Sequence, residues 1–245
     1  AKTFLWTNSS AASSSNSSLT FDSNVGWATG AWGTDYQSWM WKRHAGFDVV
    51  TYAGNSTNRQ IRHSMGIAPT MIWLKSRTSS EAWVVGSSGL SSWAEYLTLN
   101  NTDAESTNAG IFDSTAPTAT AFSLGSQNRS NENNQNYIAY LFASVDGICK
   151  VGSYTGNGST GQTITTGFQP RFLITKNVSD SGPSWLVLDT TRGWAAGDDK
   201  YIALEDSNAQ GNSDYGQPTS TGFTVTSGSS WTNASGKKYI YYAHA

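Results

Sequence analysis

The residues that could do chemistry in this sequence are few and dispersed. The three histidines, His44, His63 and His244, form none of the short-spaced pairs, such as His-x-x-x-His, that hold a metal ion. Serine is abundant throughout, and no serine stands in the strand-to-helix turn that a nucleophile elbow requires. Cys149 is the single cysteine, which excludes an internal disulfide and a cysteine zinc cage. None of these residue types therefore predicts catalysis.

Carboxylates are the other candidates for catalysis or metal binding. Glycosidases on β-sandwich folds use two carboxylates a few ångströms apart. The most acidic stretch runs from Asp198 to Asp214, and no Glu-x-Asp pair there points two carboxylates from one strand face. The stretch could offer oxygen ligands to calcium, but it lacks the spaced Asp-x-Asp-x-Asp-Gly loop. We expect a protein that is not an enzyme and has no cofactor; a surface-glycan hydrolase and a weak calcium site are the alternatives.

Tryptophan, with 11 copies, is the residue type that most favours a binding function. An indole beside Asn, Ser and Asp can stack on a sugar ring while its neighbours hydrogen bond to the hydroxyls. Six side chains in or near polar loops are predicted to bind glycans on this basis: Trp27, Trp231, Arg129, Trp32, Trp93 and Trp194. The alternative for each is a loop anchor that folds back onto the protein's own core. Trp83 and Trp185 are expected in the core, because they recur at one position within a strand.

The composition favours an all-β protein with a weakly charged surface. Charged residues make up 13% of the chain and the net charge is −2, with the basic residues scattered. This pattern excludes the basic patches that bind nucleic acid or anionic membranes, and no apolar run is long enough for membrane insertion. Thr, Tyr, Trp and Val are abundant and favour strands. The 11 Trp, 11 Tyr and 9 Phe supply the apolar area for a core.

An internal repeat organises the chain. Val49–Asn55 matches Val151–Asn157, and Gly66–Lys75 matches Gly167–Lys176, with spacings of 101 to 105 residues between all matched landmarks. Two repeats are predicted, at residues 47–148 and 149–245. Residues 1–46 match only the second half of a repeat. Either the chain is a fragment of a longer array, which we favour, or the folding unit is offset from the sequence repeat.

Each repeat of about 100 residues contains short alternating segments separated by Gly, Asn, Ser or Pro. Seven or so segments of strand length at this spacing predict tandem β-sandwich repeats with a jelly-roll-like fold. Gly54 and Gly156 are expected to close tight turns that require positive φ. In the repeat, Trp27, Arg129 and Trp231 fall at one loop position, while Trp93 and Trp194 each precede a Tyr-containing strand.

The segments Trp39–Asn55, Ile67–Lys75 and Phe142–Gly158 resemble those of a repeat family of marine bacteriophage virion and tail-associated proteins. Members of that cyanophage-type family often stand beside LamG or concanavalin-like modules. The resemblance covers nearly the whole chain and brings no catalytic residues with it. His44 and Phe47-Asp48 depart from the family pattern, in the linker between repeats.

The resemblance implies a virion structural protein, in a tail fibre or another host-facing appendage. A surface rich in hydroxyls and amides suits an adhesin with weak, multivalent glycan binding. The expected partners are a host cell-surface glycan or other virion proteins, and further copies of the chain in a homo-oligomer. The expected location is the virion, in the extracellular space. A purely structural or decorating virion component without a ligand is the main alternative.

Overall fold

The computed structural model describes residues 2–23, 26–29, 37–226 and 228–245. The protein is all-β, as its composition predicted, and the described part contains one short helix, α1 (Asn128–Asn131). The strands before α1 are β1 (Lys2–Phe4), β2 (Ser14–Asn16), β3 (Leu19–Ser23), β4 (Gly26–Thr29), β5 (Phe47–Ala53), β6 (Arg59–Arg62), β7 (Met71–Ser76), β8 (Val84–Ser87), β9 (Glu95–Thr98), β10 (Ser106–Thr107) and β11 (Ala121–Leu124). Those after it are β12 (Asn136–Phe142), β13 (Cys149–Thr155), β14 (Gln162–Thr165), β15 (Phe172–Asn177), β16 (Leu186–Asp189), β17 (Asp199–Ala203), β18 (Gly211–Ser213), β19 (Pro218–Thr219), β20 (Gly222–Val225) and β21 (Lys238–His244).

Two six-stranded antiparallel sheets form the body of the molecule. We call residues 47–148 module 1 and residues 149–245 module 2. The sheet of module 1 has the order β10-β9-β8-β7-β12-β5, and that of module 2 has the order β18-β17-β16-β15-β21-β13. A small sheet, β6-β11 in module 1 and β14-β20-β19 in module 2, accompanies each large one. The two large sheets therefore have the same strand order, with the hairpins β7–β8 and β15–β16 at their centres.

The outer face of each large sheet has its own core. In module 1, Ile72 and Leu74 of β7 pack with Phe122 of β11, and in module 2, Leu186 of β16 packs with Phe223 of β20. These residues alternate along their strands with residues of the opposite face, as the two-residue period of a strand requires. Each module is thus a large sheet covered on its outer side by a smaller one.

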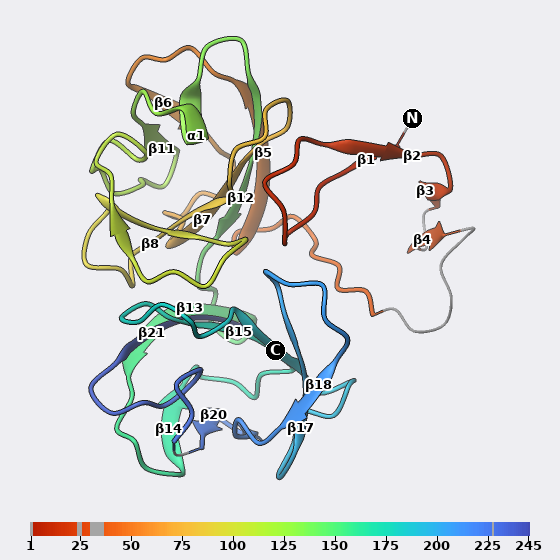
Figure 1. The fold of residues 1–245 in the computed structure, drawn as a ribbon, viewed down its shortest axis with the longest axis vertical. Coiled ribbons are helices and arrows are strands. Elements are labelled where there is room, and N and C mark those ends of the chain that lie inside the picture. The colour runs from red at the N-terminus through yellow and green to blue at the C-terminus, as the bar shows by residue number, and fades with distance from the viewer. Residues whose placement is uncertain (1, 24–25, 30–36, 227) are drawn as a thin grey trace.

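The inner faces of the two large sheets share one core. Trp73, Phe142, Ile174 and Tyr242 belong to a single buried cluster that both modules contribute to. The rings of Phe142 and Tyr242 lie 5.0 Å apart across the junction. Figure 1 shows module 1 above module 2, with the inner strands β7 and β12 above β15 and β21. The modules are therefore packed sheet against sheet. The apolar area buried between them stabilises the fold by roughly 25 cal/mol for each Å².

The described parts of the N-terminal segment, residues 2–23, 26–29 and 37–46, lie beside the modules, on the right of Figure 1. Strand β1 pairs with β2 so that Phe4 lies opposite Ser14. Leu5 packs against the shared core, and so do Trp39 and Trp41, whose rings lie 5.6 and 5.5 Å from the ring of Phe172. This N-terminal segment therefore contributes aromatic groups to the place where the two modules meet.

The structure corrects the expected reason for Gly54 and Gly156. Neither residue has positive φ. Instead, a Cβ on Gly54 would overlap the carbonyl oxygen of Glu132, and one on Gly156 would overlap that of Ala234. Glycine is needed at both positions because the chain passes directly against the backbone of another loop.

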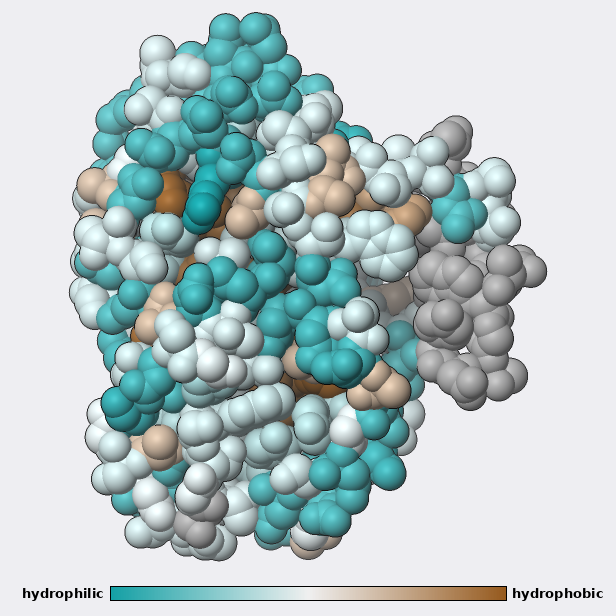
Figure 2. Space-filling model, in the orientation of Figure 1, coloured by the Kyte–Doolittle hydropathy of each residue, from teal (hydrophilic) through white to brown (hydrophobic). Residues whose placement is uncertain are grey.

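The surface drawn in Figure 2 is mostly hydrophilic, with apolar residues confined to small patches and hollows. Within the described residues, no helix is long and apolar enough to cross a membrane.

Candidate functional site

Trp231 lies in the predicted loop, but its ring packs on module 2. It stacks on Tyr215, with ring centres 5.7 Å apart and an angle of 15° between the planes. Its edge meets Tyr201 at 5.5 Å. One face of the indole is thus covered by protein, and the side chain is half-buried. Trp231 anchors its loop on the outer core of the module.

Arg129 lies on α1 of module 1, at the position that corresponds to Trp231. Its guanidinium group lies 5.7 Å from the ring centre of Tyr96, and its Nη1 donates a 3.4 Å hydrogen bond to the Tyr96 hydroxyl. Glu81 lies 4.0 Å from its Nε. Arg129 therefore rests on its own module as Trp231 does, with an aromatic side chain beneath it.

Trp93 and Trp194 also turn inward. Trp93 is half-buried and meets the ring of Phe112 edge-on at 5.5 Å. Trp194 is 2% exposed, and its indole N–H donates a 2.9 Å hydrogen bond to the carbonyl oxygen of Gly216. The prediction that Trp194 stacks on a sugar is wrong, because the side chain is a fully packed member of the core.

The remaining two candidates cannot be placed as side chains. The backbone of Trp27 lies in strand β4, whereas the sequence predicted a loop at this position. Its side chain lies outside the described residues, and so does Trp32.

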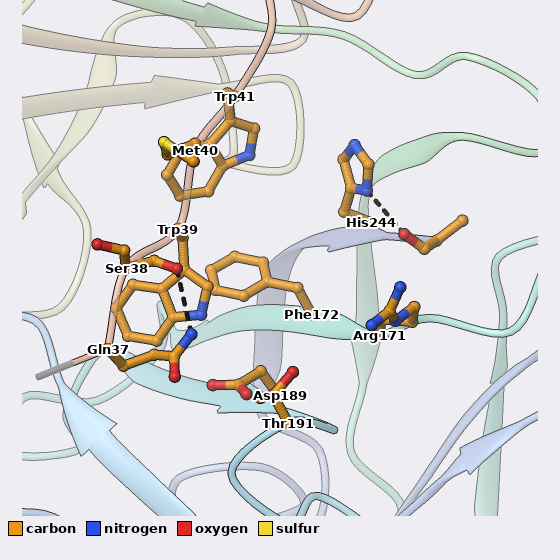
Figure 3. A pocket seen from close by; sticks show the side chains of 11 residues that line it. Gln37, Ser38, Trp39, Met40, Trp41, Arg171, Phe172, Asp189, Thr191 and His244 are labelled. Carbon is orange, nitrogen blue, oxygen red and sulfur yellow. Dashed lines mark hydrogen bonds between the residues drawn. The ribbon is translucent and has the colours of Figure 1, made fainter. Parts of the chain in front are cut away.

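A pocket that the sequence reasoning missed lies between the N-terminal segment and module 2 (Figure 3). Its volume is about 310 Å³. Residues 37–41 form one wall, and the ends of β15, β16 and β21 form the other. The lining residues are Gln37, Ser38, Trp39, Met40, Trp41, Arg171, Phe172, Asp189, Thr191, His244 and Ala245.

The apolar part of this pocket comes from Trp39, Trp41 and Phe172. Both indoles are half-buried, and Figure 3 shows Trp39 beside the ring of Phe172. The guanidinium group of Arg192 lies 5.2 Å from the ring centre of Trp39. The indole N–H of Trp39 is shielded from solvent and has no hydrogen-bond partner in the described residues. A buried donor without a partner has a cost in stability.

The polar part of the pocket consists of groups that can bind hydroxyls. Gln37, Arg171 and Thr191 are exposed at its rim, and Gln37 donates a 3.1 Å hydrogen bond to the carbonyl oxygen of Ser38. The Nδ1 atom of His244 lies 2.9 Å from the carbonyl oxygen of Ala245. This mixture of aromatic faces and neutral or cationic hydrogen-bonding groups suits a sugar or another small polyhydroxylated molecule.

Among the described residues that line the pocket, Asp189 is the one acidic side chain, and its carboxylate is already paired. Asp189 is buried, forms a short ion pair with Arg192, and accepts a 2.9 Å hydrogen bond from the Arg192 main-chain N–H.

Asp199, in the acidic stretch of module 2, supports the fold. Asp199 is fully buried and accepts hydrogen bonds from the main-chain N–H groups of Tyr215, at 2.8 Å, and Ala195, at 3.1 Å. Burial raises the pKa of its carboxyl group to about 6. Asn212 donates to Asp198 at 3.0 Å. Within the described residues, no group of three or more His, Cys, Asp and Glu side chains could hold a metal ion.

Pairs of stacked tyrosines bind the two loops that contain Arg129 and Trp231. Tyr52 stacks on Tyr137 at 5.2 Å and donates to the carbonyl oxygen of Ser130 at 2.7 Å. In module 2, Tyr154 stacks on Tyr239 at 5.0 Å and donates to the carbonyl oxygen of Thr232 at 2.7 Å. These bonds fix the loops against the body of each module, which explains why their large side chains face inward.

The fold and site define an all-β protein whose two large sheets have the same strand order, with an aromatic pocket beside the second sheet. Comparison with protein families shows that residues 4–245 match the model described as "Domain of unknown function (DUF7483)". The chain belongs to this family. No curated protein and no solved structure matches it significantly.

Proposed function

We propose that this protein is a structural component of a phage virion, in a tail fibre or another host-facing appendage, and that it binds carbohydrate weakly. The phage assignment is supported by the resemblance of the segments at the module boundaries to marine phage proteins. The partners in this proposal are a host cell-surface glycan and other virion proteins, with several copies of the chain in one appendage. Many copies turn weak single contacts into useful avidity.

The observation that carries carbohydrate binding is the pocket beside Trp39. It combines the indoles of Trp39 and Trp41 with the exposed hydrogen-bonding groups of Gln37 and Arg171. A pyranose ring has an apolar C–H face and a polar rim, so it matches both parts. The proposed binding site is therefore at the junction between the N-terminal segment and module 2, and not in the loops that carry Arg129 and Trp231.

A glycan array with the purified chain tests this proposal. We expect weak binding that falls at least fivefold in Arg171→Ala and in Gln37→Ala. Arg62→Ala is the matched control, because Arg62 is also exposed but lies on β6 of module 1. Circular dichroism checks that all variants are folded. Equal binding by Arg171→Ala and Arg62→Ala would remove the pocket from the site.

The second candidate is a purely structural or decorating component of the virion. It is favoured by the inward packing of Trp231, Arg129, Trp93 and Trp194, each of which rests on its own module. Absence of binding to any glycan or host surface by the wild-type chain would select this role.

A further inference from the structure

A second pocket lies within module 2, with a volume of about 260 Å³. Its walls are the residues just before β14, the end of β20, residues 196–197 and residues 214–217. The main-chain N–H of Gly161 donates to the carbonyl oxygen of Val225 at 3.0 Å, and that of Thr226 donates to the carbonyl oxygen of Tyr215 at 3.3 Å. These bonds join the walls to one another, so the pocket is part of the fold of the module.

Asp214 is the one charged side chain among the described residues that line this pocket. It is exposed, and its Oδ1 accepts hydrogen bonds from the main-chain N–H of Gly216 and the hydroxyl of Thr226, both at 3.1 Å. A carboxylate has about four lone-pair sites, so it can accept further hydrogen bonds. A ligand that suits the pocket therefore brings a hydrogen-bond donor and no negative charge.

Module 1 shows which donor fits against this carboxylate. Asp113 stands nine residues before Phe122 of β11, as Asp214 stands nine residues before Phe223 of β20. The side-chain amide of Asn58 donates to the Oδ1 atom of Asp113 at 2.6 Å. In module 1, a carboxamide from the neighbouring loop is thus bonded to the equivalent aspartate.

Strand register identifies the residue of module 2 that corresponds to Asn58. The first residues of β6 and β14, Arg59 and Gln162, lie opposite the last residues of β11 and β20. The residues just before them are Asn58 and Gly161. Gly161 has no side chain, and a Cβ at this position would meet no atom within 4 Å. The place that a carboxamide takes in module 1 is therefore open in module 2, where Gly161 and Asp214 both line the pocket.

We propose that this pocket binds the acetamido group of an N-acetylated amino sugar. An acetamido group has the same carbon, carbonyl oxygen and nitrogen as the side chain of asparagine. Its N–H donates to the carboxylate of Asp214, as Asn58 donates to Asp113. The side-chain amide of Gln217 donates to its carbonyl oxygen, and its methyl group packs on Val225, since both residues line the pocket. The inference rests on the proposed carbohydrate binding and adds a second site, with a defined class of sugar.

Titration of the full chain with single sugars, followed by saturation-transfer NMR, tests the proposal. The probes are N-acetylglucosamine and N-acetylgalactosamine, each compared with glucose and galactose. We expect the acetamido sugars to bind about tenfold more tightly, because they add a hydrogen bond to a charged acceptor. Unchanged affinity between the acetamido sugars and their parent sugars overturns the proposal.

Gly161→Asn fills the pocket with the side chain that module 1 already has. Asparagine tolerates positive φ better than most residues, and φ is +84° at this position. We expect this variant to bind the acetamido sugars about tenfold more weakly, because its own carboxamide takes the place of the ligand. Gly161→Ala is the matched control, because it brings the same backbone strain without a carboxamide, and it should keep most of the affinity. Circular dichroism checks that both variants are folded.

Asp214→Asn gives the same test without a change in the backbone. It keeps one carbonyl oxygen and replaces the other acceptor with an amide donor, so the affinity for acetamido sugars should again fall about tenfold. Acetamido binding that survives in both Gly161→Asn and Asp214→Asn overturns the proposal.

Arg171→Ala distinguishes this pocket from the one beside Trp39. The preference for acetamido sugars should be the same in this variant as in the wild type. Loss of that preference in Arg171→Ala would place it in the pocket beside Trp39 and overturn the inference. If Arg171→Ala binds glucose as the wild type does, while Gly161→Asn loses the acetamido sugars, the pocket beside Trp39 is removed from the proposed function and the present inference is supported.

Discussion

The indole N–H of Trp185 in module 2 donates a hydrogen bond to the carbonyl oxygen of Thr98 in module 1. Trp185 is fully buried, and the bond crosses the junction between the two large sheets. Trp185, the residue before β16, therefore serves two purposes: its ring fills the shared core, and its N–H bonds one module to the other. The two modules share this core, and the N-terminal segment adds Leu5, Trp39 and Trp41 to it.

Removal of the Trp185 ring is expected to destabilise the whole chain. Trp185→Ala should lower the free energy of unfolding by about 3–5 kcal/mol, because it leaves a cavity in the shared core. Trp185→Phe should cost less, although it also loses the bond to Thr98, worth about 1 kcal/mol. Urea denaturation followed by circular dichroism measures both. Met40→Ala is the control, because Met40 is 71% exposed, and a loss as large as that of Trp185→Ala there would contradict the assignment of the core.

Trp231 should matter for stability before it matters for any ligand. Its ring is stacked on Tyr215 and meets Tyr201, so Trp231→Ala removes two aromatic contacts. We expect a loss of about 1–3 kcal/mol in the free energy of unfolding. Glycan binding of the folded variant should equal that of the wild type at a temperature well below its midpoint. A variant as stable as the wild type but with reduced glycan binding would return Trp231 to the binding site.

Gly54→Ala tests the close approach of two chain segments in module 1. The added methyl group would overlap the carbonyl oxygen of Glu132, so the loop that carries α1 must shift. We expect Gly54→Ala to lower the free energy of unfolding by about 2–4 kcal/mol, which is at the upper end for single substitutions. Gly156→Ala should have a similar effect. Thermal melts of both variants measure this effect. Thr57→Ala, in the same loop, is the control and should leave the melting temperature unchanged. If Gly54→Ala melts at the same temperature as Thr57→Ala, the loop can shift without a loss of stability.

The sequence was most informative where two copies of one pattern could be compared. The matches that place Trp83 with Trp185 and Lys75 with Lys176 located the strands, and all four side chains are buried. The candidate binding residues were harder to predict, because a tryptophan among Asn, Ser and Gly has the same local sequence whether it faces solvent or its own core. Tyr215, 16 positions from Trp231 along the chain, decides that question, and its contact depends on how two loops fold together.

The pocket could not be found from local patterns for a similar reason. Its two walls, residues 37–41 and the ends of β15, β16 and β21, are more than 100 residues apart in the sequence. The Trp-Met-Trp order was the available signal, because alternate residues of an extended segment share a face. Accordingly, Trp39 and Trp41 both contact Phe172, and Met40 between them is exposed.

Asp199 should make the protein more stable in mild acid. Burial raises the pKa of its carboxyl group to about 6, and the neighbouring carboxylates of Asp214 and Asp198 act in the same direction. The folded state therefore binds a proton at a pH where the unfolded chain, with an ordinary pKa near 4, does not. This contribution to stability is fully present below about pH 4 and is lost as the pH rises through 6. Between pH 7 and pH 5 the free energy of unfolding should increase by about 1 kcal/mol.

The difference between the wild type and Asp199→Asn isolates this group. The variant cannot be protonated at position 199, so its unfolding free energy should change less between pH 7 and pH 5, by about 1 kcal/mol. Burial also raises the pKa of Glu205. This group is present in both proteins, so its contribution to the free energy of unfolding cancels in the difference between them. Asp48 acts in the opposite sense, because hydrogen bonds from Ser64 and Val49 hold its pKa below the usual value, and its contribution is lost only at lower pH. Urea denaturation at pH 5, 6 and 7 measures the two profiles. Parallel profiles would mean that Asp199 is ionised in the folded protein across this whole range, with its charge satisfied by the N–H groups of Tyr215 and Ala195.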